Sequence, residues 1–209
     1  TYTYLYPEDE DAYAPKDGPN LYTDPEMAAE AAVRAVDLGF TGVKFDPAGP
    51  YSVFDGRQPS LERLELSERY TSSIREAVGN RADLLFGTHG QFTPSGALRL
   101  ARRLEAYDPL WFEEPVPPEG YAALAQVRQS VAAPICVGER LFTRYDFLPI
   151  FENRLADYIM PDVVWTGGIS ELRKMATMAE AYYIPVSPHN AMGSIQIIAG
   201  AHTMMTVPN

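Results

Sequence analysis

Short apolar runs alternate with longer amphipathic stretches along almost the whole chain. The short runs are rich in β-branched and aromatic residues and are typical of buried strands, whereas the longer ones have the spacing of amphipathic helices. Strands are expected at 1–6, 41–45, 83–87, 109–113, 134–139, 157–160 and 184–187, and helices at 25–38, 61–78, 94–107, 121–131, 144–153, 169–182 and 193–205. Strands that alternate with helices form parallel βαβ units, so the pattern predicts an α/β fold.

Polar residues gather where the predicted strands end, at His89, Glu113, Glu139, Asp162 and His189. In a parallel β/α barrel these strand ends share one face, which is where such barrels carry their active sites. A doubly wound sheet is the alternative. That fold would favour a glycine-rich phosphate loop after an early strand, and the sequence contains no G-x-G-x-x-G. The barrel is therefore the favoured architecture.

Two segments, 7–23 and 47–60, are rich in proline, glycine and acidic residues and predict long loops. Loops of this length in a compact domain often serve as lids over an active site. A solvated excursion without a function is the alternative for both.

Composition narrows the class of protein. The chain has 28 acidic and 17 basic residues, a net charge of −11, which disfavours binding to nucleic acid or to an anionic membrane surface. No apolar run is long enough to span a bilayer. Cys136 is the single cysteine and cannot form an internal disulfide, as is typical of a reducing cytoplasm. A cytoplasmic protein is expected.

Glu113 and Glu139 each end an apolar run, one βα repeat apart. If neighbouring strands carry them, the two carboxylates face each other and repel unless a proton or a cation lies between them. Oxygen ligands suit a hard divalent ion such as Mg²⁺. The alternative is a pair of ordinary strand-end acids that interact with Arg140 or other bases.

Asp162 and His189 form a second pair with nearly the same separation. A carboxylate beside an imidazole orients the ring and raises its basicity, which produces a general base near neutral pH. A purely structural histidine is the alternative.

His89 lies in the stretch Gly-Thr-His-Gly-Gln-Phe-Thr at 87–93, where small residues allow close approach of a ligand. It is a candidate acid, metal ligand or hydrogen-bond donor, with a helix-cap neighbour as the alternative. Lys44 and Asp46 at the end of the second strand add a cation and a carboxylate. His202, on the last predicted helix, is expected to pack in the core. No Gly-x-Ser-x-Gly occurs, so a serine triad is not predicted.

Several motifs taken together resemble the mandelate racemase/muconate lactonizing enzyme branch of the enolase superfamily. They are Phe-Glu-Glu-Pro-Val at 112–116, Gly-Glu-Arg at 138–140, Pro-Asp-Val at 161–163 followed by Gly-Gly-Ile at 167–169, Met-Ala-Glu-Ala at 178–181, and Pro188-His189. The stretch 138–144 and the histidine after strand three are similar to sugar-acid dehydratases, particularly the galactonate dehydratase type. The stretch 87–93 also resembles galactarolactone and anhydrogalactonate cycloisomerases.

The resemblance implies a (β/α)7β TIM-type barrel in a homo-oligomeric enzyme. Residues 1–209 would form one incomplete barrel domain with strands one to seven, without the N-terminal capping domain and without strand eight. A divalent metal, Mg²⁺ or Mn²⁺, would bind the carboxylate of a small sugar acid or lactone and stabilise an enediolate.

Roles for individual residues follow from the same resemblance. Glu113 and Glu139 would bind the metal, His189 would be the base oriented by Asp162, and His89 would be the acid that helps the 3-hydroxyl leave. Glu114 and Arg140 would be supporting neighbours, and Arg140, Gln91 and Asp46 would contact the substrate.

Two departures from the family pattern matter. Where the family has its first metal-binding aspartate, at the end of strand three, this chain has Gly87. A third ligand would then come from His89 or, second, Asp46, unless water takes its place. Strand two carries Lys44-Phe45-Asp46 instead of the Lys-x-Lys of many racemases, so a second base is missing and one-base chemistry is favoured.

The predicted function is a Mg²⁺-dependent sugar-acid dehydratase or cycloisomerase that removes the proton next to a carboxylate and then eliminates a β-oxygen. One alternative is a racemase or epimerase of a hydroxy acid, with Lys44 as the second base. Another is a non-catalytic, sugar-acid-binding relative that has lost its metal.

Overall fold

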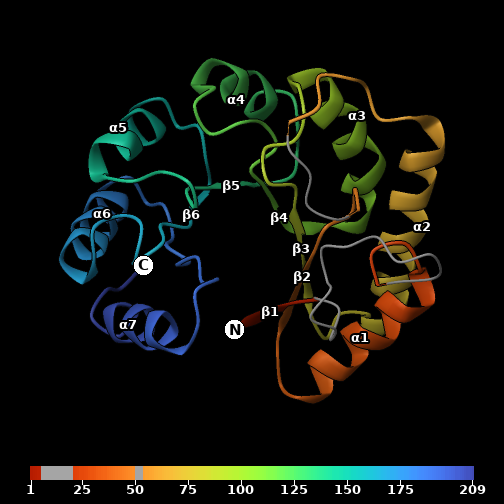
Figure 1. The fold of residues 1–209 in the computed structure, drawn as a ribbon, viewed down its shortest axis with the longest axis horizontal. Coiled ribbons are helices and arrows are strands. Elements are labelled where there is room, and N and C mark those ends of the chain that lie inside the picture. Colours follow the sequence, from red (N-terminus) through yellow and green to blue (C-terminus); the bar gives the residue numbers. More distant parts are fainter. Residues whose placement is uncertain (6–20, 50–53) are drawn as a thin grey trace. The chain divides into compact units, whose positions relative to one another are not determined.

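The computed structural model describes residues 1–5, 21–49 and 54–209 (Figure 1). It divides into two compact units, residues 1–117 with 130–133 and residues 118–129 with 134–209. Most of the predicted loop at 7–23, and residues 50–53 of the predicted loop at 47–60, lie outside the described residues, so the proposed lids stay predictions.

The first unit contains four parallel strands in the order β1 (Tyr2–Tyr4), β2 (Gly42–Phe45), β3 (Asp83–Gly87) and β4 (Pro109–Glu113). Helices α1 (Pro25–Asp37), α2 (Leu61–Val78) and α3 (Pro94–Leu104) connect them and lie on one side of the strands (Figure 1). A 3₁₀ turn, η1 (Glu105–Tyr107), follows α3. The strand register pairs Tyr4 with Lys44 and Gly87 with Glu113, which brings these four residues to one edge.

Local sequence explains where these helices begin. Asp24 accepts hydrogen bonds from the backbone amides of Glu26 and Met27, and Ser60 and Thr93 cap α2 and α3 in the same way. Proline occupies the first position of α1 and α3, where its missing N–H costs nothing.

The core of the first unit is aromatic where it supports the strand ends. The ring of Phe45 packs against Phe86 and Tyr70, at centroid distances of 5.4 and 5.6 Å. Burial, followed by the negative charge of Asp46, raises the pKa of Tyr70 far above its usual value. Its hydroxyl therefore stays protonated and donates a hydrogen bond to the carbonyl of Leu21 at 2.7 Å.

The second unit contains β5 (Ile135–Val137) and β6 (Tyr158–Ile159), which pair in parallel, and helices α4 (Tyr121–Arg128), α5 (Arg144–Glu152), α6 (Ile169–Ala181) and α7 (Ser194–Met204). Two isolated parallel bridges, Ile159 with Val186 and Asp162 with His189, extend the strand pairing. The Asp162 bridge is the backbone contact that brings the predicted acid and base together.

Three expectations about elements need correction. The strand predicted at 184–187 is reduced to the single bridge at Val186, because Pro185 and Pro188 on either side have no N–H to donate. The predicted strands at 134–139 and 157–160 are also shorter than expected. His202 is exposed and does not pack in the core, since the buried stripe of α7 runs through Gln196, Gly200 and Thr203. Among the described residues, no helix is both long and apolar enough to cross a membrane.

Gly138, which precedes Glu139, lies in a tightly packed part of the second unit. Its φ is +132°, and an added Cβ would lie 2.7 Å from a ring carbon of Phe147. Gly138→Ala should lower the free energy of unfolding by about 3 kcal/mol, since backbone strain and overpacking add. Urea unfolding of the full-length protein measures this.

Gly79→Ala is the matched control, because Gly79 has a φ of +58° and nothing lies within 4 Å of an added Cβ. With a ψ of −131°, its backbone also lies in a region that favours glycine, so that substitution should cost only the backbone strain, about 1–2 kcal/mol. Equal losses for the two variants would contradict the packing argument at Gly138.

Candidate active site

His189 and Asp162 form a hydrogen-bonded pair in the second unit. Nδ1 of His189 lies 2.7 Å from Oδ2 of Asp162. The other carboxylate oxygen, Oδ1, accepts hydrogen bonds from the backbone amides of Val164 at 2.7 Å and Trp165 at 3.1 Å. Asp162 is fully buried. The backbone therefore fixes the carboxylate, and the carboxylate fixes the imidazole.

Gln196 of α7 completes this pair and was missed in the sequence. Its amide nitrogen donates to Oδ2 of Asp162 and, at 3.3 Å, to the carbonyl of His189. Its amide oxygen accepts from the backbone amides of Ala191 and Met192. Gln196 is 4% exposed. A glutamine inside the apolar run Ser-Ile-Gln-Ile-Ile-Ala was the available signal, since a buried amide needs partners.

Glu139 lies on the other side of the imidazole. Its Oε2 is 3.5 Å from Nε2 of His189, and this buried oxygen makes no hydrogen bond to any described residue. The Trp165 ring packs over His189 at a centroid distance of 5.3 Å. A proton taken up by the imidazole would thus lie between two carboxylates, which stabilise the imidazolium electrostatically.

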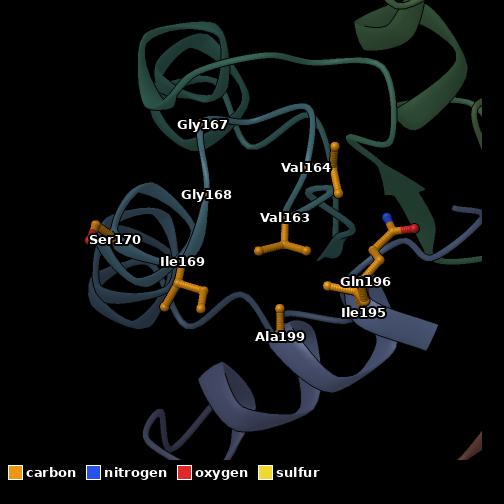
Figure 2. Close-up of a pocket in the computed structure, with 9 residues that line it drawn as sticks. All are labelled: Val163, Val164, Gly167, Gly168, Ile169, Ser170, Ile195, Gln196 and Ala199. Atoms are coloured by element: carbon orange, nitrogen blue, oxygen red, sulfur yellow. The ribbon is translucent and has the colours of Figure 1, made fainter. Parts of the chain in front are cut away.

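A pocket of about 430 Å³ lies beside Gln196, the residue that holds Asp162 (Figure 2). It lies between the loop after β6, the first turn of α6, and α7, and its lining residues are Val163, Val164, Gly167, Gly168, Ile169, Ser170, Ile195, Gln196 and Ala199. Most of this lining is apolar. Gln196 is the residue that both lines the pocket and touches Asp162.

In the first unit, Glu113 and Lys44 form a buried ion pair. The Lys44 ammonium contacts Oε1 of Glu113, and the indole N–H of Trp111 donates to Oε2 at 3.1 Å. Glu113 is fully buried and Lys44 is 2% exposed. The cation that the sequence requires beside Glu113 is here a lysine side chain.

Asp46, Tyr4 and His89 form a second group in the first unit. The Tyr4 hydroxyl donates to Oδ1 of Asp46 at 2.6 Å, and Nδ1 of His89 lies 3.2 Å from the same oxygen. The Tyr4 and His89 rings stack with an interplanar angle of 25°. This arrangement brings the predicted acid together with a carboxylate.

Gly87 lies directly beside this group. A Cβ at Gly87 would be 2.9 Å from the Tyr4 hydroxyl, 3.0 Å from Oδ1 of Asp46 and 3.3 Å from Cε of Lys44. The space that an aspartate side chain would need at the end of β3 is therefore filled by three side chains from β1 and β2.

The ends of β3 and β4 are tied together by hydrogen bonds to the backbone carbonyls of Glu113 and Glu114. The Thr88 hydroxyl donates to the carbonyls of Glu113 and Glu114, and the Gly90 amide donates to the carbonyl of Glu114 at 2.7 Å. His89 and Glu114 both have a left-handed backbone, with φ of +50° and +39°. Non-glycine residues in this region are strained, and such strain clusters at functional sites.

The remaining predicted residues have less informative surroundings. Glu114 is 1% exposed and Gln91 is 7% exposed. The backbone amide of Gln91 donates a hydrogen bond to the carbonyl of Thr88. Arg140 is partly exposed and follows Glu139 in the turn that closes with a hydrogen bond from Leu141 to Gly138. Their roles at the site stay predictions.

A metal centre is not assembled in the part of the chain that the structure describes. No three histidine, cysteine, aspartate or glutamate side chains there form a group that could hold an ion. Glu113 is occupied by Lys44 and Trp111, and Gly87 provides no ligand. Glu139 presents a buried carboxylate oxygen that has no hydrogen bond to a described residue. The residues as arranged do not fit the three-carboxylate site that the resemblance implies.

Comparison with known proteins identifies the family. Residues 26–209 match the model of the enolase C-terminal domain-like family, and the chain belongs to that family. Members of the enolase superfamily generally use a divalent metal ion. The resemblance to this superfamily is thereby confirmed.

Two similar relatives are named dehydratases. D-xylonate dehydratase of Haloferax volcanii is 38% identical over 89% of this chain and 46% of its own length. D-gluconate dehydratase of Thermoproteus tenax is 36% identical over 83% of this chain and 34% of its own length. The chain spans less than half the length of either relative.

Solved structures support the fold. A mandelate racemase/muconate lactonizing enzyme-like protein from Roseovarius sp. TM1035 is 45% identical to this chain. The superposition covers all of this chain and 51% of that protein, with a TM-score of 0.91. An α/β fold of the TIM-barrel type, with six parallel strands among the described residues, is thus confirmed.

The Lys44–Glu113 pair generates a prediction about metal binding. Lys44→Met leaves Glu113 buried without its partner, which should cost about 3–5 kcal/mol of stability. If a divalent ion uses Glu113, millimolar Mg²⁺ or Mn²⁺ should restore part of that loss and bind at least ~10-fold more tightly than to the wild type, because the ammonium no longer competes. Thermal unfolding and calorimetric titration of the full-length protein measure both.

Lys174→Met is the control, since Lys174 pairs with Glu171 at 3.3 Å on the surface. Its loss should cost less than about 1 kcal/mol and leave metal binding unchanged. A Lys44→Met protein whose stability and affinity do not respond to either ion would exclude Glu113 as a ligand.

Proposed function

We propose that this chain forms part of the catalytic barrel of a sugar-acid dehydratase. The enzyme would remove the proton next to the carboxylate of a 2,3-dihydroxy acid and eliminate the 3-hydroxyl, which yields a 2-keto-3-deoxy acid and water. The observation that carries the proposal is the buried, fully hydrogen-bonded Asp162 that orients His189. The names of the similar relatives, dehydratases of D-xylonate and D-gluconate, support the same reaction.

His189 is the general base of the proposed reaction. With Nδ1 directed at Asp162, the ring carries its proton on Nδ1 and presents the lone pair of Nε2. Nε2 takes the α-proton, and the electron pair of the C–H bond enters the enediolate. The carboxylates of Asp162 and Glu139 then stabilise the charged imidazolium.

His89 is the proposed general acid. The C3–O bond breaks with its electron pair on oxygen, and His89 gives that oxygen a proton so that water leaves. The resulting enol rearranges to the 2-keto acid. Arg140 and Gln91 are the proposed substrate contacts, and Glu114 supports the end of β4.

Elimination is favoured over racemisation by the state of Lys44. A racemase needs a second base on the opposite face of the substrate, but the Lys44 ammonium is committed to the carboxylate of Glu113. Expulsion of a ring oxygen from a lactone is the related cycloisomerase outcome, and it uses the same base.

The wider setting of the reaction completes the proposal. The substrate is a small sugar acid or lactone, and a cytoplasmic homo-oligomer is expected. Mg²⁺, with Mn²⁺ as its substitute, is the predicted ion. Because the described residues do not form a three-ligand site, no step is assigned to the ion.

His189→Asn tests the base. In D₂O, the wild-type full-length protein should exchange the α-proton of D-xylonate or D-gluconate and release the 2-keto-3-deoxy acid, and the variant should lose at least ~1,000-fold in both rates because no group accepts the proton. Proton NMR of the substrate measures exchange. His202→Asn, on the exposed face of α7, is the control. Unchanged exchange in His189→Asn would overturn the assignment.

Gln196→Met tests the support of the dyad. Removing the amide that donates to Asp162 should lower kcat about 10-fold with little change in KM, since supporting hydrogen bonds typically contribute 10- to 100-fold. Gln129→Met, at the exposed end of α4, is the matched control. Equal kcat values in the two variants would show that Gln196 has no part in orienting His189.

A further inference from the structure

We infer that Tyr4 and Asp46 are positioning residues that hold His89 in the orientation of a general acid, and that Gly87 is required to make room for them. The inference rests on the proposed dehydratase function. It gives Asp46 a role different from the metal-ligand and substrate-contact roles that the sequence predicts. It also gives Tyr4, which sequence analysis did not single out, a place in the site.

One carboxylate oxygen of Asp46 contacts both Tyr4 and His89. Oδ1 of Asp46 receives the Tyr4 hydroxyl at 2.6 Å and faces Nδ1 of His89 at 3.2 Å. The side chain of Asp46 is 2% exposed, so water does not compete for this carboxylate. A proton on Nδ1 of His89 is stabilised there, which leaves Nε2 to exchange the proton used in catalysis.

The imidazole of His89 is also held by its neighbours and by its own backbone. The Tyr4 ring stacks on the His89 ring with a centroid distance of 6.3 Å. The Lys44 ammonium in turn lies 4.9 Å from the centroid of the Tyr4 ring. The backbone of His89 is left-handed, and neighbouring hydrogen bonds from Thr88 and Gly90 to Glu114 hold the turn.

Gly87 leaves the side-chain position at the end of β3 empty. Gly87 lies where any Cβ would press on both the Tyr4 hydroxyl and Oδ1 of Asp46, at 2.9 and 3.0 Å. The departure from the family aspartate therefore has a local explanation, because the Tyr4–Asp46 hydrogen bond uses that space. The contact between Asp46 and His89 differs from that of Asp162 and His189, which are hydrogen-bonded: Nδ1 of His89 lies at ion-pair distance from Asp46 without an aligned hydrogen bond, so the stacked Tyr4 ring contributes to the orientation of His89.

The two histidines act at different steps, and this separates a positioning role from general damage. Loss of the His89 orientation should slow breakage of the C3–O bond while His189 continues to remove the α-proton. In D₂O, Asp46→Asn should lower dehydration of D-xylonate and D-gluconate about 100-fold, and Tyr4→Phe about 10-fold. Exchange of the α-proton should stay within about 2-fold of the wild-type rate.

A substrate with a better leaving group provides the rescue. Fluoride leaves carbon with little need for a proton, so elimination from 3-deoxy-3-fluoro-D-gluconate should differ less than about 10-fold between wild type and Asp46→Asn. Gly87→Ala, which pushes Tyr4 and Asp46 apart, should behave as Tyr4→Phe does. Asp83→Asn, an exposed carboxylate at the start of the same strand β3, is the control and should match the wild type.

Two kinetic results would overturn the inference. Exchange and dehydration that fall together would assign Asp46 a structural role, and an equal loss on the fluorinated substrate would exclude a role in acid catalysis. A wild-type protein that neither exchanges nor dehydrates D-xylonate, D-gluconate, D-galactonate, D-arabinonate or D-mannonate would contradict the proposed function.

The orientation itself has a measurement that needs no turnover. Solid-state ¹⁵N NMR of histidine-labelled full-length protein, assigned by the difference from His89→Gln, should show a proton on Nδ1 of His89 in the wild type and its loss in Asp46→Asn. That proton is present both in the imidazolium, which donates from Nε2, and in the Nδ1–H imidazole that remains after donation. A neutral Nε2–H tautomer with no proton on Nδ1 in the wild type would overturn the inference whatever the activity.

Discussion

Three carboxylates buried at the strand ends are matched by a cation or by hydrogen-bond donors, and this requirement for a partner shapes both units. Removing a charge from water without a partner costs several kcal/mol. Glu113 is matched by Lys44 and Trp111, Asp46 by Tyr4 and His89, and Asp162 by His189, Gln196 and two backbone amides. The site chemistry is thus a consequence of how the fold satisfies its buried acids.

This requirement also explains why the two histidines differ in their surroundings but share a pattern. Nδ1 of His189 is hydrogen-bonded to Asp162, and Nδ1 of His89 lies at ion-pair distance, 3.2 Å, from Asp46. Both carboxylates are also held by other donors. His189 is further enclosed by Glu139 and Trp165, which suits a group that gains charge. His89 is instead held by a stacked tyrosine and a strained turn. A base and an acid can therefore be built from one residue type by changing its neighbours.

Much of this arrangement follows from the sequence, because it depends on periodicity and on the ends of strands. The helices, the six parallel strands and the Asp162–His189 contact were all predictable from alternating apolar runs and from the position of polar residues after them. The strand at 184–187 was overestimated because apolar character outweighed the two prolines in the prediction. His202 was misplaced because the apolar pattern of α7 does not coincide with its buried stripe.

What the sequence did not reveal depends on contacts between distant residues. Gln196 meets Asp162 across 34 positions, and Tyr4 meets Asp46 across 42, with no motif to indicate either contact. Lys44 was recognised as a cation near the site, but its pairing with Glu113 depends on the register of three strands. Such contacts are set by packing, which local sequence does not encode.

The crowding around Gly87 restricts the mutational paths open to this protein. Restoring an aspartate at that position by one substitution would bring its side chain into the space of Tyr4, Asp46 and Lys44. The tyrosine and the lysine or aspartate of β2 would have to change as well before the new carboxylate could be tolerated. The strand ends of the first unit are therefore an epistatic set: positions in three strands constrain one another, and a change at any one of them is neutral or harmful according to the others.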